Sequence, residues 1–217
     1  MVVVVPWIVR DAVMAARKPN GDLRMSAGAR AQRTKTRASA KELTAALNGR
    51  HHKTGMRLFA FLVIAHWAEH VAQAVQIYVW GWSLPEARGV LGIPFPWLVT
   101  SEWMHYGYAL FMLVGFILLR PGFTGISRTW WNVALGVQIW HHFEHLLLLL
   151  QAQTGIHLAG KEAPTSIIQL IAPRVELHLF YNAVVTLPMV IAMVLHSRPT
   201  SAGAQAPTCT CAVPEPV

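Results

Sequence analysis

The chain has 217 residues, of which 54% are hydrophobic and only 13% are charged, and its net charge is +8. Soluble domains contain roughly 25% charged residues, so this composition argues against a soluble fold and predicts an integral membrane protein. The cysteines, Cys209 and Cys211, are too few to form a disulfide framework.

The first 55 residues form a basic arm. Of the 18 lysine and arginine residues in the chain, 12 lie between Arg10 and Arg57. The arm is rich in arginine, alanine, threonine and serine, so we expect it to be largely disordered. It has few aromatic side chains and precedes a hydrophobic segment, which favours anionic lipid as its partner and argues against nucleic acid.

Four apolar segments follow the arm. They run from residue 57 to 80, from 97 to 119, from 129 to 151 and from 175 to 195. Each is long enough to cross the hydrocarbon core, which takes roughly 20 residues of helix, and backbone groups in lipid must be bonded within the segment. We therefore predict an all-α integral membrane protein with a four-transmembrane-helix bundle over residues 56–197 and a flexible tail over 198–217.

The positive charges predict the orientation of this bundle. The basic arm, the loop with Arg120 and Arg128, and the tail with Arg198 lie on one side, whereas the opposite loops hold only Arg88, Lys161 and Arg174. Because cytoplasmic loops carry the excess of lysine and arginine, we expect both termini to be cytoplasmic and the chain to lie in the cell membrane.

The segments also carry a repeated polar pattern. The motif H-x-x-E-H occurs in the first and third segments at an offset of 75 residues, so that His66, Glu69, His70 and Gln76 correspond to His141, Glu144, His145 and Gln151. In the second and fourth segments, His105 and Tyr108 correspond to His178 and Tyr181 at an offset of 73. We predict two tandem two-helix repeats, about residues 56–120 and 129–197, with the same orientation.

The repeated residues predict a buried metal site. Positions i, i+3 and i+4 share one helix face, and the depth of each motif places the six histidines in one extracytoplasmic layer. A charged group at the centre of a membrane helix costs about 2.5–3.5 kcal/mol, so these groups need a partner, and a transition metal suits them. The predicted metal ligands are His66, His70, His105, His141, His145 and His178. The predicted catalytic residues, which bridge ions, shuttle protons or donate hydrogen bonds or electrons, are Glu69, Glu144, Tyr108 and Tyr181.

These residues favour a membrane metalloprotein with one or two iron or copper ions, and zinc as a further candidate. The expected chemistry is that of a metal-dependent oxidoreductase acting on oxygen, a quinone or another lipophilic substrate. One alternative is an electron-transfer subunit with b-type haem, and a second is a proton or metal-ion transporter. A second copy of the chain or a redox protein is the expected protein partner.

Other polar residues are expected to be structural. Glu102 and Glu176 lie nearer the interface, and His142 points away from the main face of its helix. We expect His52 and His196 to be interfacial or loop residues. A C-x-C pair in a proline-rich tail is a weak metal signal, so we expect Cys209 and Cys211 to belong to an unstructured tail.

Overall fold

A computed structural model describes residues 27–198 together with Cys209 and Cys211, and it divides the chain into two units, residues 1–42 and 43–217. Every regular element among the described residues is a helix. The first 26 residues of the predicted arm and the rest of the predicted tail lie outside the described residues.

The described part of the basic arm is helical. Helix α2 runs from Ala27 to Asn48, and its residues 32–43 are exposed. This stretch is rich in alanine, lysine and arginine, which have high intrinsic helix propensity. Local propensity therefore accounts for this part of α2.

The second unit contains four helices that are long and apolar enough to cross a membrane, as predicted. They are α3 (His52–Tyr78), α5 (Glu102–Leu119), α6 (Gly125–Thr154) and α7 (Arg174–Ser197). The second predicted segment is shorter than expected, because Ser101 is extended and separates α4 (Trp97–Thr100) from α5. Serine is a preferred residue at a helix N-terminus, which fits this break.

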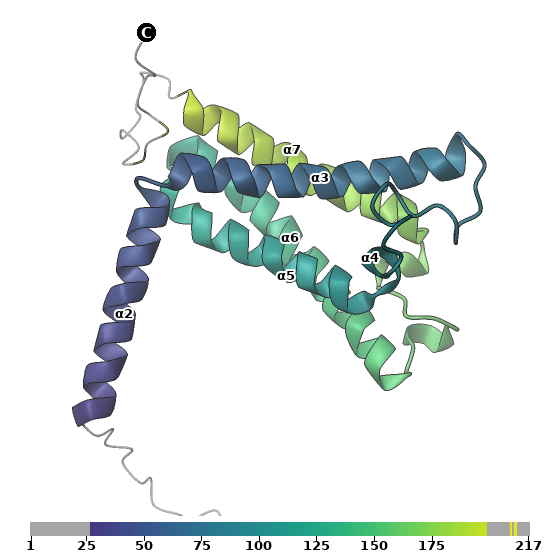
Figure 1. Ribbon diagram of the computed structural model, residues 1–217, viewed down its shortest axis with the longest axis horizontal. Coiled ribbons are helices and arrows are strands. Elements are labelled where there is room, and N and C mark those ends of the chain that lie inside the picture. The colour runs from purple at the N-terminus through teal and green to yellow at the C-terminus, as the bar shows by residue number, and fades with distance from the viewer. Residues whose placement is uncertain (1–26, 199–208, 210, 212–217) are drawn as a thin grey trace, which may run out of the picture. The chain divides into compact units, whose positions relative to one another are not determined.

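Helix α6 packs against both α5 and α7, and α3 packs mainly against α7. Helices α3 and α5 separate toward the end of the bundle at which α4 lies (Figure 1). The short helix η1 (Arg120–Gly122) joins α5 to α6, and the connection from α6 to α7 contains η2 (Leu158–Gly160) and η3 (Ile168–Leu170). This divergence leaves room for a cavity in one half of the bundle.

The interior of the bundle has an apolar half and a polar half. The apolar half is built around Phe59, Phe116, Phe123 and Trp131, all buried, and the Trp131 indole donates a hydrogen bond to the Phe116 carbonyl at 2.9 Å. Large apolar side chains also cover the outside of the helices: Phe61, Phe180 and Leu187 are each more than half exposed. Apolar groups that face outward around a partly polar interior are typical of a bundle in lipid.

Candidate metal centre

Six histidines, two each from α3 and α6 and one each from α5 and α7, meet in the polar half of the bundle. We call them the histidine layer: His66, His70, His105, His141, His145 and His178. The His178 ring is central, with its centroid 5.2 Å from that of His70, 5.4 Å from that of His145 and 5.9 Å from that of His141. Rings bound to one tetrahedral ion would have centroids roughly 5 Å apart, so this spacing is compatible with a shared ion.

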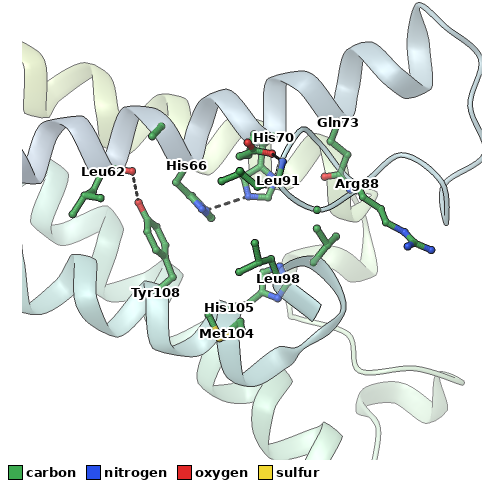
Figure 2. A pocket seen from close by; sticks show the side chains of 14 residues that line it. Leu62, His66, His70, Gln73, Arg88, Leu91, Leu98, Met104, His105 and Tyr108 are labelled. Carbon is green, nitrogen blue, oxygen red and sulfur yellow. Dashed lines mark hydrogen bonds between the residues drawn. The ribbon is translucent and has the colours of Figure 1, made fainter. Parts of the chain in front are cut away.

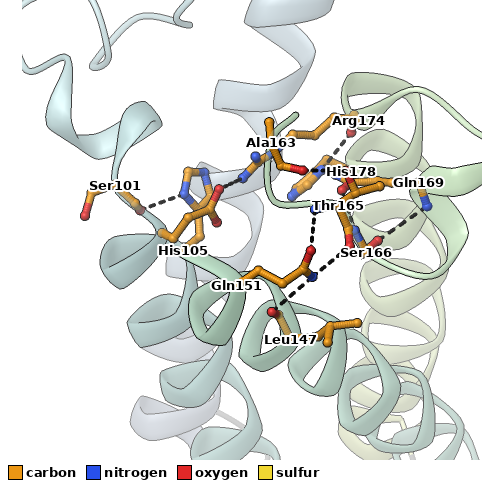
Figure 3. Close-up of polar contacts among 11 residues, drawn as sticks. Ser101, His105, Leu147, Gln151, Ala163, Thr165, Ser166, Gln169, Arg174 and His178 are labelled. Atoms are coloured by element: carbon orange, nitrogen blue, oxygen red, sulfur yellow. Dashed lines mark hydrogen bonds and ion pairs between the residues drawn. The ribbon is translucent and has the colours of Figure 1, made fainter. Parts of the chain in front are cut away.

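Two histidines of the layer have their protons fixed by the backbone. The Nδ1 atom of His105 lies 2.9 Å from the Ser101 carbonyl, and that of His178 lies 2.7 Å from the Arg174 carbonyl (Figure 3). A carbonyl only accepts, so each Nδ1 carries the proton and each Nε2 presents a lone pair. The His178 Nε2 is buried and has no hydrogen-bond partner among the described residues. A histidine held in this way is prepared to bind a metal through Nε2.

The two H-x-x-E-H motifs make corresponding ring contacts. His66 and His70 approach at 3.1 Å between their Nε2 atoms, and the His141 and His145 centroids are 4.5 Å apart. Each tyrosine of the pattern covers the first histidine of a motif, with centroid distances of 3.9 Å between Tyr108 and His66 and 4.5 Å between Tyr181 and His141. The tyrosines thus border the layer on the side of the apolar half.

Both predicted catalytic glutamates hold loops in place. The Glu69 carboxylate accepts hydrogen bonds from the backbone of Val90 at 2.7 Å and of Leu91 at 3.0 Å. The Glu144 carboxylate accepts one from the backbone of Ile168 at 3.0 Å. These bonds fold the loop that follows each H-x-x-E-H helix back toward the histidines, a contact that the sequence analysis did not anticipate.

A glutamine that follows each H-x-x-E-H motif also holds the backbone of a loop. Gln76 both donates to and accepts from the backbone of Gly89, at 2.9 and 2.8 Å. Gln151 makes the same pair of contacts with Thr165, at 2.9 and 3.2 Å (Figure 3). Gly89 lies 13 residues after Gln76, and Thr165 lies 14 residues after Gln151. The two H-x-x-E-H helices therefore make similar contacts to the loops that follow them, in addition to sharing a motif.

Charged residues beside the layer are paired. Arg174 forms an ion pair with Glu102 at 2.8 Å, which joins the first turns of α7 and α5. The Tyr78 hydroxyl donates to the Glu176 carboxylate and joins the end of α3 to α7. Both glutamates therefore have partners at the ends of the helices, as structural residues would.

Two cavities adjoin the histidine layer within the described bundle. A cavity of about 290 Å³ is lined by His66, His70, His105 and Tyr108 together with apolar side chains such as Leu98 (Figure 2). A second cavity, of about 190 Å³, reaches His70, His105, His178 and Arg174. The corresponding space beside His141, His145 and Tyr181 measures only about 10 Å³. The larger cavity thus reaches the layer between α3 and α5, and the second one extends to the first turns of α7.

The ring nitrogens of the layer do not converge on one point. Among the described residues, the only group of three or more candidate ligand atoms within 4.8 Å of one another is His52, His196 and Cys211, in the apolar half. Binding of an ion in the histidine layer therefore requires rotation of its rings. Side-chain torsions of this kind interconvert between staggered wells without a change of fold.

Gly89 offers a direct test of how the loop between α3 and α4 is held. Its φ angle is +74°, and a Cβ there would overlap the Glu69 carboxylate, whereas a Cβ on Gly81, at φ +71°, meets open space. We expect Gly89→Ala to lower the free energy of unfolding by roughly 2–4 kcal/mol, because it combines backbone strain with displacement of Glu69. Gly81→Ala is the control and should cost about 1 kcal/mol. Thermal unfolding in detergent measures both, and equal losses would contradict a special role for the Glu69 contact.

The backbone carbonyls of Ser101 and Arg174 were not identified from the sequence. Each lies four residues before the histidine whose proton it fixes. This spacing near the start of a helix could have identified the carbonyl partner from the sequence. No protein-family model, curated protein or solved structure matches this chain.

Proposed function

We propose that the chain is a membrane metalloprotein that holds one or two iron or copper ions in its histidine layer. The observation that carries this proposal is the meeting of six imidazoles from four helices, two of them with Nδ1 bound to a carbonyl and the Nε2 lone pair left for a metal ion. His141, His145 and His178 are buried and the other three imidazoles are half-buried. Such groups are costly inside a membrane without a partner, and imidazole is a good ligand for iron and copper. The paired second nitrogens of His105 and His178 match the outer contacts of metal-binding histidines.

We infer that the reaction is an oxidoreduction on oxygen, a quinone or another lipophilic molecule, for which the bound ions would supply one-electron chemistry. The 290 Å³ cavity supports a small substrate, because it lies at the lower end of the roughly 300–1,000 Å³ found for ligand sites. Its wall combines His66, His70 and Tyr108 with apolar side chains. In this proposal Tyr108 and Tyr181 donate hydrogen bonds or electrons, and Glu69 and Glu144 move protons at the carboxylate oxygens.

The proposal includes an origin by duplication. The paired contacts of Gln76 and Gln151, and the ring contacts of Tyr108 and Tyr181 with equivalent histidines, support two tandem repeats. The cavity beside the first repeat and the much smaller space beside the second suggest that the repeats diverged. In this proposal the first repeat admits substrate and the second is tightly packed.

We further propose that both termini are cytoplasmic, on the basis of the positive residues in the arm, the loop between α5 and α6, and Arg198. In this orientation the basic arm lies near anionic lipid headgroups, and the histidine layer lies on the extracytoplasmic side of the bilayer midplane.

Contacts within the bundle disfavour the two alternatives. The rings of the layer touch one another, which suits a compact ion better than a haem macrocycle inserted between two axial histidines. A transporter needs a polar path, but the other half of the bundle interior is filled by Phe59, Phe116 and Trp131. This packing supports a closed site that is reached from one side.

Elemental analysis of the full chain, purified in mild detergent, tests the proposal together with an optical spectrum. We expect one or two iron or copper ions per chain after reconstitution and no Soret band. A Soret band would replace the proposal with a haem protein. Absence of iron and copper from the layer after reconstitution would remove the proposed centre, and proton or metal-ion flux in liposomes would then support a transporter.

A further inference from the structure

A second histidine pair lies at the other end of the bundle interior. His52 opens α3 and His196 lies in the last turn of α7, and their rings meet edge to face with centroids 5.1 Å apart. Both are buried, and Phe123 covers them with centroids at 5.2 and 4.8 Å. Both residues lie at helix ends, where interfacial residues are expected, but the packed ends of the helices enclose their rings.

The two cysteines lie beside this pair. The Cys209 thiol is buried and lies 3.1 Å from the His196 Nε2 atom. The ligand atoms of His52, His196 and Cys211 all lie within 4.8 Å of one another. A tetrahedral ion bound by nitrogen and sulfur separates its ligand atoms by roughly 3.3–3.8 Å. Side-chain movements of about 1 Å would therefore bring these ligand atoms to the distances that such an ion requires.

His52 has ring contacts but lacks a hydrogen-bond partner that would explain its burial. It is fully buried, and within the part of the chain that the structure describes neither of its ring nitrogens has a hydrogen-bond partner. The backbone of η1 is held closely against this ring: a Cβ on Gly122 would overlap it, and the Gly122 amide donates to the Asn48 side chain at 2.9 Å. A buried imidazole needs a partner for at least one nitrogen, and a metal ion is a suitable one.

We propose that His52, His196, Cys209 and Cys211 form a second metal site, for a thiophilic closed-shell ion, Zn(II) or Cu(I). Two cysteines and two histidines match the ligand set of structural zinc sites, and thiolates also select Cu(I). His52 precedes His66 by 14 residues on α3, so this site lies roughly 21 Å along the helix from the start of the histidine layer.

The thiols bind the ion as thiolates, so binding releases one proton from each cysteine. A bound cation favours the thiolate form of both sulfurs at neutral pH. Four protein ligands leave no open position, as in sites that stabilise structure. The site joins the Cys209–Cys211 pair to the ends of α3 and α7.

The test uses the full chain, reduced and freed of metal by a chelator, and titrates it with Co(II) as a spectroscopic substitute for zinc. We expect one equivalent to give tetrahedral visible bands and a sulfur-to-cobalt charge-transfer absorption. Zn(II) should displace the cobalt. A parallel titration with Cu(I) against a competing chelator shows which ion binds more tightly.

Matched variants locate the site. Cys211→Ser, a one-atom change in a half-buried side chain, should remove about half of the sulfur band, because Cys209 remains, and weaken binding by roughly 10- to 100-fold or more. His51→Ala, at the exposed neighbour of His52, should bind as the wild type does. His178→Ala, in the histidine layer, should also keep the cobalt spectrum. This variant separates the two proposals, because either metal site can be disproved without disproving the other.

Thiol labelling provides a test without a substitution. With one equivalent of Zn(II) or Cu(I), both cysteines of the wild-type chain should react with a maleimide at least about tenfold more slowly than in the metal-free chain. A cobalt spectrum without sulfur bands, unchanged affinity in Cys211→Ser, or equal labelling with and without metal would each overturn the proposal.

Discussion

Replacing His178 by alanine should remove most of the iron or copper bound in the histidine layer. His178 contacts His70, His105, His141 and His145, and its buried Nε2 atom has no partner within the described residues. Loss of outer contacts alone typically costs 10–100-fold in metal affinity, so loss of this central ligand should cost about 100-fold or more. Metal content after dialysis against a chelator measures the effect.

His142→Ala is the matched control for this experiment. His142 follows His141 on the same helix, but its ring contacts Tyr106 rather than the layer, at a centroid distance of 5.2 Å. We expect the variant to retain wild-type iron or copper content. Equal losses in the two variants would indicate general unfolding, and full retention in His178→Ala would show that the layer does not bind metal through this residue.

Replacing Trp131 by alanine should have the largest effect on stability. Its side chain is fully buried, stacks on Phe123 with centroids 4.1 Å apart, and also packs against Phe59 and Phe116. Removal of such a side chain leaves a cavity and typically costs 3–5 kcal/mol, and the hydrogen bond from its indole to the Phe116 carbonyl is lost as well. Denaturation in detergent, followed by helix content, measures the loss of unfolding free energy.

The neighbouring tryptophan provides the control. Trp130 is 37% exposed on the outer surface of α6, so Trp130→Ala should change the unfolding free energy by less than about 1 kcal/mol. A similar loss in both variants would show that the apolar half of the bundle is not packed around Trp131.

The sequence by itself determined the four long apolar helices and the helix faces on which the site residues lie. Four long apolar segments predicted four helices, because a chain in lipid must satisfy its backbone within each segment. The spacing of His66, Glu69 and His70, repeated 75 residues later, placed these side chains on single helix faces, since helical periodicity is a local property.

Only the tertiary structure decided what depends on contacts between distant parts of the chain. It directed the Glu69 and Glu144 carboxylates to loop amides, left a larger cavity beside His66 and His70 than beside His141 and His145, and broke the second segment at Ser101. It also brought Cys211 within reach of His52, 159 positions earlier in the chain. These features arise from loop closure and from the divergence of α3 from α5, which no periodicity within a single segment encodes.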